Sequence, residues 1–97
     1  MTVHFIEAGD DDNPTVIFVH GAGGSTATWF MQLKYLSDEL HVVTLDLNGH
    51  GQTPDRKQDD VLSSYIEDIK EVVDVFDTPY LAGHSMGGAL TQKYALT

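Results

Sequence analysis

The stretch Gly-His-Ser-Met-Gly-Gly at residues 83–88 constrains the fold of this chain more than any other. The short apolar run before it, residues 79–82, has the pattern of a buried strand, whereas residues 89–96 suit a helix. Ser85 is therefore expected at a sharp turn from strand to helix. A turn of that kind exposes the serine hydroxyl and aims it away from the sheet.

Two glycines make this turn sterically possible. Gly83 and Gly87 flank the serine and have no side chains to obstruct the approach of the strand and the helix. The backbone N–H of Met86 would lie at the helix N-terminus, where it can face developing negative charge. A Gly-x-Ser-x-Gly pattern also occurs by chance in chains of this length, so the motif alone is suggestive.

The periodicity of the apolar residues predicts four strands and three helices. Strands are expected at residues 3–7, 15–19, 41–47 and 79–82, and helices at 29–40, 62–76 and 89–96. The turn residues at 8–14 suggest that the first two strands form a hairpin. The alternation of the later elements predicts a three-layer α/β/α fold with a mostly parallel sheet, right-handed crossovers and one early antiparallel strand.

A glycine-rich loop at residues 20–25 follows the second strand. Its glycines allow the backbone to approach a ligand closely, with N–H groups pointing into a site. A phosphate-binding loop is the rival interpretation, but the loop has neither a Lys-Ser/Thr ending nor the Gly-x-Gly-x-x-Gly spacing. Ser25 or Thr26 could cap the helix that follows.

Composition excludes several classes of function. The net charge of −10 repels nucleic acid and anionic membranes. The absence of cysteine excludes disulfides, thiolate metal sites and a cysteine nucleophile, and we expect no metal and no cofactor. No apolar run approaches the length of a membrane span, and residues 1–4 lack the pattern of a signal peptide. A cytoplasmic location is therefore the default expectation.

Three loops that follow successive parallel strands, at residues 20–24, 46–51 and 83–88, together closely resemble the α/β-hydrolase superfamily. The resemblance covers the whole chain and points to the branch with a serine nucleophile, which includes esterases and lipases. It implies that Ser85 is the nucleophile and that the N–H of Met86 is one donor of an oxyanion hole. The second donor would be the N–H of Ala22, with Gly23 as the alternative. Losing one such donor costs roughly 3–4 kcal/mol of barrier in a serine hydrolase.

The resemblance assigns structural roles to the other motif residues. His20 and His50 would shape loops, Asp46 would bind loop backbone, and the side chain of His84 would pack away from the nucleophile. Ala22, Trp29 and Met86 would form the wall of an apolar acyl pocket. The glycines expected to shape these loops and turns are Gly21, Gly49, Gly51, Gly83 and Gly87.

The resemblance implies a small-molecule substrate with an apolar acyl part. A serine in place of aspartate at the turn argues against the dehalogenases and epoxide hydrolases of the superfamily. The remaining reactions are hydrolysis of a carboxylester, lactone, thioester or carbon–carbon bond, and cofactor-free perhydrolysis.

The departure from the family lies after Ser85, where the chain contains no Asp, Glu or His. A serine nucleophile of this superfamily needs an acid and a histidine, in that order, further along the chain. We therefore expect residues 1–97 to be the N-terminal part of a single domain, with a bare edge on the last strand and almost no activity alone. Two alternatives remain: a non-catalytic module that binds a small apolar ligand, and a half-domain completed by a second chain.

Overall fold

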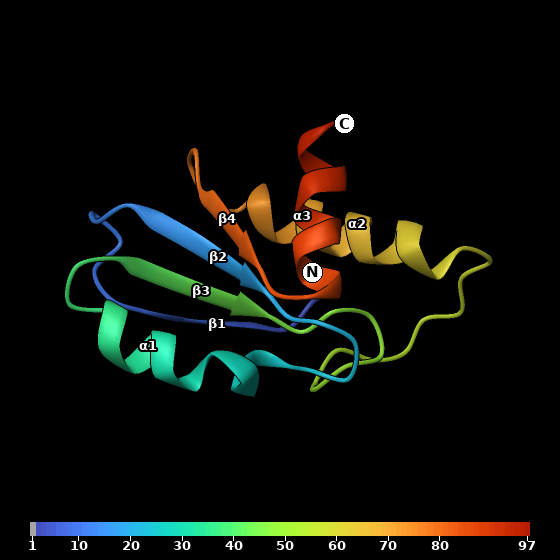
Figure 1. The fold of residues 1–97 in the computed structure, drawn as a ribbon, viewed down its shortest axis with the longest axis horizontal. Coiled ribbons are helices and arrows are strands. Elements are labelled where there is room, and N and C mark those ends of the chain that lie inside the picture. The colour runs from blue at the N-terminus through green and yellow to red at the C-terminus, as the bar shows by residue number, and fades with distance from the viewer. Residues whose placement is uncertain (1) are drawn as a thin grey trace.

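A four-stranded sheet with the order β1-β3-β2-β4 forms the centre of the molecule in the computed structural model, which describes residues 2–97 (Figure 1). Three strands run parallel: β3, β2 and β4. β1 lies at one edge, antiparallel to β3. The strands are β1 (Phe5–Ala8), β2 (Thr15–Val19), β3 (His41–Leu45) and β4 (Tyr80–Gly83).

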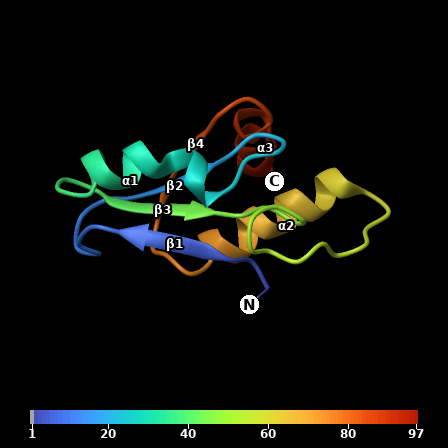
Figure 2. The same ribbon diagram turned by 90° about the horizontal axis from the view of Figure 1, so that it is seen from below.

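Helices cover both faces of this sheet. The 3-10 turn η1 (Thr26–Trp29) and helix α1 (Phe30–Leu36) lie on one face, and α2 (Val61–Val73) and α3 (Met86–Ala95) lie on the other. Figure 2 shows β1 and β3 of the sheet pointing in opposite directions. Alternate strand residues supply the two cores: Phe18 packs with Trp29, whereas its neighbour Ile17 packs with Ile69 of α2. The structure is thus the three-layer α/β/α arrangement that the sequence predicts.

The predicted hairpin between the first two strands is wrong. β1 pairs with β3, with Phe5 opposite Leu45 and Ala8 opposite Val42. β2 is paired on both sides, with β3 on one and β4 on the other, so β1 cannot lie beside it and instead adds to the free edge of β3. The segment at residues 9–14 therefore connects two strands that are not neighbours in the sheet.

The helices begin near the predicted residues but end earlier. Ser25 caps η1 through its hydroxyl, which accepts the N–H of Ala27, and the carboxylate of Asp60 accepts two N–H groups at the start of α2. The last apolar residues of the two stripes, Leu40 and Phe76, lie beyond the helix ends and still pack against the cores. An apolar stripe thus marks the buried face of a segment more accurately than it marks the helix terminus.

β4 forms the edge of the sheet opposite β1. It pairs with β2 alone among residues 2–97, and Tyr80 at its start is 67% exposed. Within that part of the chain, none of the helices has the length and apolar character needed to span a bilayer.

Candidate active site

Ser85 occupies the sharp turn between β4 and α3. Its backbone has φ 57° and ψ −122°, a conformation that residues with a β-carbon rarely adopt. The side chain is exposed, and the helix begins at the next residue, Met86. The local strain and the exposure of the hydroxyl therefore occur at the same residue.

The turn requires glycine on either side of Ser85, because the backbone there packs too closely for a side chain. A β-carbon at Gly87 would overlap the carbonyl oxygen of Val19 at the end of β2, and one at Gly83 would overlap the carbonyl of Gly87. The parallel pairing continues past β4, because the N–H of His84 donates to the Val19 carbonyl at 3.2 Å. The start of α3 therefore lies directly against the end of β2.

The glycine-rich loop after β2 lies beside Ser85. A cleft of about 340 Å³ is lined by residues of the loop and of the turn: Gly21, Ala22, Gly23, Gly24, Thr28, His84 and Ser85. A β-carbon built on Gly21 would lie 3.7 Å from the Ser85 hydroxyl oxygen, which shows how closely the loop approaches the serine.

The backbone N–H groups around this cleft differ in their partners. The N–H of Gly23 donates to Nε2 of His50 at 3.1 Å, and that of Gly24 donates to the Gly21 carbonyl at 3.0 Å. The N–H groups of Ala22 and Met86 donate to no acceptor within residues 2–97. Of the two loop residues named from the sequence as oxyanion donors, Gly23 has its N–H already engaged.

His20 and His50 connect the loop after β2 to the loop after β3. Nε2 of His20 accepts the N–H of Leu47 at 3.1 Å, so its proton is on Nδ1, which donates to the carbonyl of Gly21 at 2.7 Å. The two imidazole rings lie 4.8 Å apart. Burial lowers the pKa of His20 below its ordinary value, which keeps the ring neutral and able to accept.

Asp46 also connects the segment after β2 with the loop after β3. Its buried carboxylate accepts the N–H of Thr26 at 2.6 Å and that of Gln52 at 3.0 Å, and it contacts Nδ1 of His4 at 2.9 Å. A β-carbon at Gly51 would overlap this carboxylate. Gly51 has φ 50° and Gly49 has φ 73°, so both adopt left-handed backbone that glycine tolerates best.

The three residues predicted to line an acyl pocket do not come together. Ala22 lies in the cleft with Ser85, whereas Trp29 packs against Phe18 at a ring separation of 4.9 Å. Met86 lines a separate groove of about 740 Å³ between α2 and α3, together with Leu62, Ile66, Ala89 and Leu90. The side chain of His84, expected to be packed, is exposed at the cleft. The outward turn of the backbone at Ser85 keeps its neighbour at the surface.

A network beneath the β3 loop was not predicted from the sequence. The buried carboxylate of Asp68 on α2 accepts the N–H of Asn48 at 2.7 Å and also binds the Arg56 guanidinium. Burial raises the pKa of Asp68 despite these partners. An acid on the polar side of an apolar stripe gives no sequence signal for burial, because its partners are distant along the chain.

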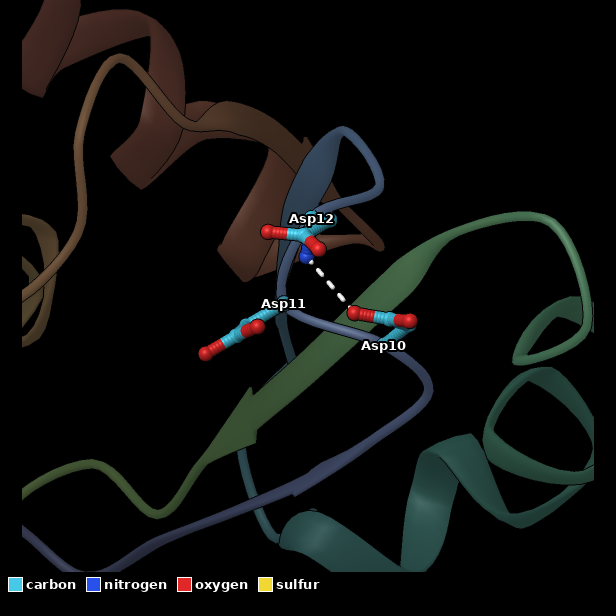
Figure 3. Close-up of side chains that lie close together, drawn as sticks. All are labelled: Asp10, Asp11 and Asp12. Atoms are coloured by element: carbon cyan, nitrogen blue, oxygen red, sulfur yellow. Dashed lines mark hydrogen bonds between the residues drawn. The ribbon is translucent and has the colours of Figure 1, made fainter.

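The acidic turn at residues 10–12 brings three carboxylates within 4.8 Å of one another (Figure 3). The N–H of Asp12 donates to the Asp10 side chain at 2.9 Å, and the N–H of Asn13 donates to the Asp10 carbonyl at 3.0 Å. All three aspartates are exposed. These hydrogen bonds are those of an ordinary aspartate turn between β1 and β2.

The amino-acid sequence is similar to those of two hydrolases. The chain is 32% identical to (E)-2-((N-methylformamido)methylene)succinate hydrolase of Acinetobacter baylyi, over 99% of this chain and 36% of that protein. It is 33% identical to human Epoxide hydrolase 4, over 99% of this chain and 28% of that protein. The chain thus spans about a third of the length of the curated relatives it matches.

The fold also matches part of a larger protein of known structure. The thioesterase domain from the curacin biosynthetic pathway superposes with a TM-score of 0.87 and 24% identity, over 96% of this chain and 36% of that one. At this identity the likeness shows the fold alone. Residues 16–97 also match the model of a family described as "Alpha/beta hydrolase family". This match covers β2 through α3 and all three loops around Ser85, and the chain therefore belongs to the alpha/beta hydrolase family.

Proposed function

We propose that this chain carries the nucleophile and the oxyanion donors of a serine hydrolase that cleaves ester-like bonds. The observation that supports it best is the position of Ser85, exposed at positive φ between β4 and α3, beside a cleft whose loop leaves one N–H free. In this proposal the Ser85 hydroxyl attacks an acyl carbon, and the N–H groups of Ala22 and Met86 receive the charge of the tetrahedral oxygen.

The reaction proceeds in two steps. In the first, the serine oxygen forms a bond to the acyl carbon, and the bond to the leaving group breaks as that group takes a proton. In the second, water attacks the acyl-enzyme, releases the acid and returns a proton to the serine oxygen. Free donors placed before the reaction lower the barrier because they need no reorganisation when the charge develops.

The general base of this reaction is not among residues 2–97. No side chain there forms a hydrogen bond with the Ser85 hydroxyl, and no Asp, Glu or His follows Ser85 in the sequence. We propose that these 97 residues are the N-terminal part of one domain. A longer product of the same gene then supplies the acid and the histidine, and the 97 residues alone are nearly inert.

A serine nucleophile favours acyl substrates over epoxides, despite the similarity to Epoxide hydrolase 4. Attack of a serine oxygen on an epoxide carbon would give an alkyl ether, which water does not readily cleave. A carboxylate nucleophile gives an ester, which water does cleave. We therefore propose a carboxylester, lactone, thioester or activated carbon–carbon bond as the substrate class, with a small molecule as substrate.

Fluorophosphonate labelling tests this proposal. The 97-residue chain and the longest product of the same gene are treated side by side, and the adduct is located by mass spectrometry. We expect an adduct on Ser85 in the longer product, none on Ser63, which is also exposed, and little or none in the short chain. A longer product without a Ser85 adduct contradicts the proposed nucleophile, and strong labelling of the short chain contradicts its inertness.

A further inference from the structure

We propose that His50 is a positioning residue that selects which N–H of the loop at residues 21–24 is presented to Ser85. The inference rests on the proposed function and adds a residue that acts on the reaction only through the loop. It follows from the two hydrogen bonds of the His50 ring, from the open space beside Gly23, and from which neighbouring N–H groups already have an acceptor.

The ring of His50 is held on both of its nitrogen atoms. Nε2 accepts the N–H of Gly23 at 3.1 Å, so the proton is on Nδ1, which donates to the carbonyl of Asn48 at 3.0 Å. The ring lies 4.8 Å from the His20 ring and 5.8 Å from the Tyr65 ring. His50 therefore presents a fixed acceptor to the glycine loop.

Within residues 2–97, two hydrogen bonds hold the glycine loop at this point: the Gly24 N–H donates to the Gly21 carbonyl across the turn, and the Gly23 N–H donates to His50. A β-carbon built on Gly23 would meet no atom within 4 Å, whereas one on Gly24 would lie 2.9 Å from His20 and from Thr28. Packing thus restricts Gly24, whereas the turn bond still allows the Ala22–Gly23 peptide to rotate, because Gly23 has no side chain and its φ of 79° is one that glycine tolerates. The contact with His50 determines the orientation of the loop at Gly23.

Because of this contact, the N–H groups of the loop differ in whether they already have a hydrogen-bond acceptor. The N–H groups of Gly23 and Gly24 are engaged, and the N–H of Ala22 donates to nothing within residues 2–97. Without the acceptor on His50, the N–H of Gly23 would be released and the Ala22–Gly23 peptide would lose its fixed orientation, so the adjoining N–H of Ala22 would be held less firmly. Oxyanion stabilisation depends on donors held in place before reaction, so the loss should lower kcat and leave KM nearly unchanged.

A matched pair of variants separates the acceptor from the ring. His50→Phe keeps a ring beside His20 and Tyr65 but removes the acceptor, whereas His50→Gln can place an amide oxygen near the position of Nε2. In the longest product of the gene, with a chromogenic ester as substrate, we expect His50→Phe to lower kcat about 10- to 100-fold. His50→Gln should recover most of that loss, with KM within about twofold in both variants.

A second measurement reports on the hydrogen bond without catalysis. In ¹⁵N-labelled protein, the amide proton of Gly23 should move upfield and exchange faster in His50→Phe, while that of Gly24 stays unchanged. A purely structural role would lower the unfolding midpoint of both variants and would not separate Phe from Gln in kcat.

The outcomes distinguish the two proposals. If the wild type is labelled at Ser85 and His50→Phe retains its kcat, the positioning role is wrong and the proposed nucleophile stands. Equal losses of kcat in the Phe and Gln variants also overturn it. If Ser85 is unreactive in the longest product, the proposed function fails and the catalytic role of His50 fails with it. The Gly23 amide then reports only whether the hydrogen bond exists.

Discussion

The carboxylate of Asp46, at the end of β3, accepts the backbone N–H of Thr26, at the start of η1, with a distance of 2.6 Å. The same buried group also accepts the N–H of Gln52. One side chain therefore fixes the geometry of two loops that are twenty residues apart in the sequence but adjacent at the end of the sheet.

We expect Asp46→Ala to lower the free energy of unfolding by about 3 kcal/mol, because two backbone N–H groups and the ring of His4 lose the buried carboxylate that they contact. Urea unfolding followed by circular dichroism measures the change. Asp59→Ala is the matched control, since Asp59 is an exposed acid, and it should change stability by less than about 0.5 kcal/mol. Similar losses in the two variants would contradict the role of Asp46.

Adjacent glycines at the start of α3 should respond in opposite ways to alanine. A β-carbon at Gly87 would overlap the Val19 carbonyl, so Gly87→Ala should destabilise the fold by at least about 2 kcal/mol. At Gly88 the nearest atom would lie at 3.5 Å, an ordinary contact, and alanine favours a helix by up to about 1 kcal/mol. A Gly87→Ala variant as stable as Gly88→Ala would refute the close packing of α3 on β2.

Ser85→Gly should stabilise the fold. The positive φ of Ser85 costs a residue with a β-carbon about 1–3 kcal/mol, which glycine avoids. Glycine also increases the entropy of the unfolded chain, which offsets up to about 1 kcal/mol of that gain. We therefore expect a net gain of about 1 kcal/mol by urea unfolding, with Ser85→Ala close to wild type. No difference between the Gly and Ala variants would show that the turn is unstrained.

Stability should decrease as the pH falls below about 6.5, the ordinary histidine pKa. Burial lowers the folded-state pKa of His20, so between the folded and unfolded values the unfolded chain binds more protons. The contribution is present above the unfolded pKa and is lost as the pH falls through the folded one. Asp68 acts in the opposite sense at lower pH, because its folded-state pKa is raised from 3.8.

Nuclear magnetic resonance separates the two groups, because the His20 ring signals titrate individually. Urea unfolding at several values of pH gives the accompanying change in stability. A His20 ring that titrates above the ordinary histidine pKa in the folded chain would contradict the expected direction.

The open edge of β4 should promote self-association of the 97-residue chain, since it presents unpaired backbone beside an exposed aromatic residue. Tyr80→Lys places a charge at the start of this edge and should slow aggregation, measured by light scattering. Tyr35→Lys on α1 removes an aromatic residue of similar exposure, 62% against 67%, without touching a strand. An equal effect of the two variants would assign aggregation to exposed apolar surface in general.

Much of the fold could be predicted from the sequence, because it depends on local patterns. The continuous apolar run at residues 15–19 predicted β2 at its observed bounds, and the glycines around Ser85 predicted the turn into α3. The strand that pairs with β1 could not be predicted in this way. Pairing is decided by which strand edge remains free once the parallel crossovers have formed, and that is a property of the assembled sheet.

The sequence by itself determined the order of the elements, the strand-to-helix turn at Ser85 and the identity of the three loops, because residue type and spacing set the local backbone. Only the tertiary structure decided which N–H groups of the glycine loop are free and that the predicted pocket residues lie apart. It also decided which N–H groups the expected backbone-binding residue Asp46 accepts, and that Asp68 is a buried hydrogen-bond centre. Hydrogen bonds between loops join residues that are distant in the chain, and their partners are fixed only when the ends of parallel strands meet at one edge of the sheet.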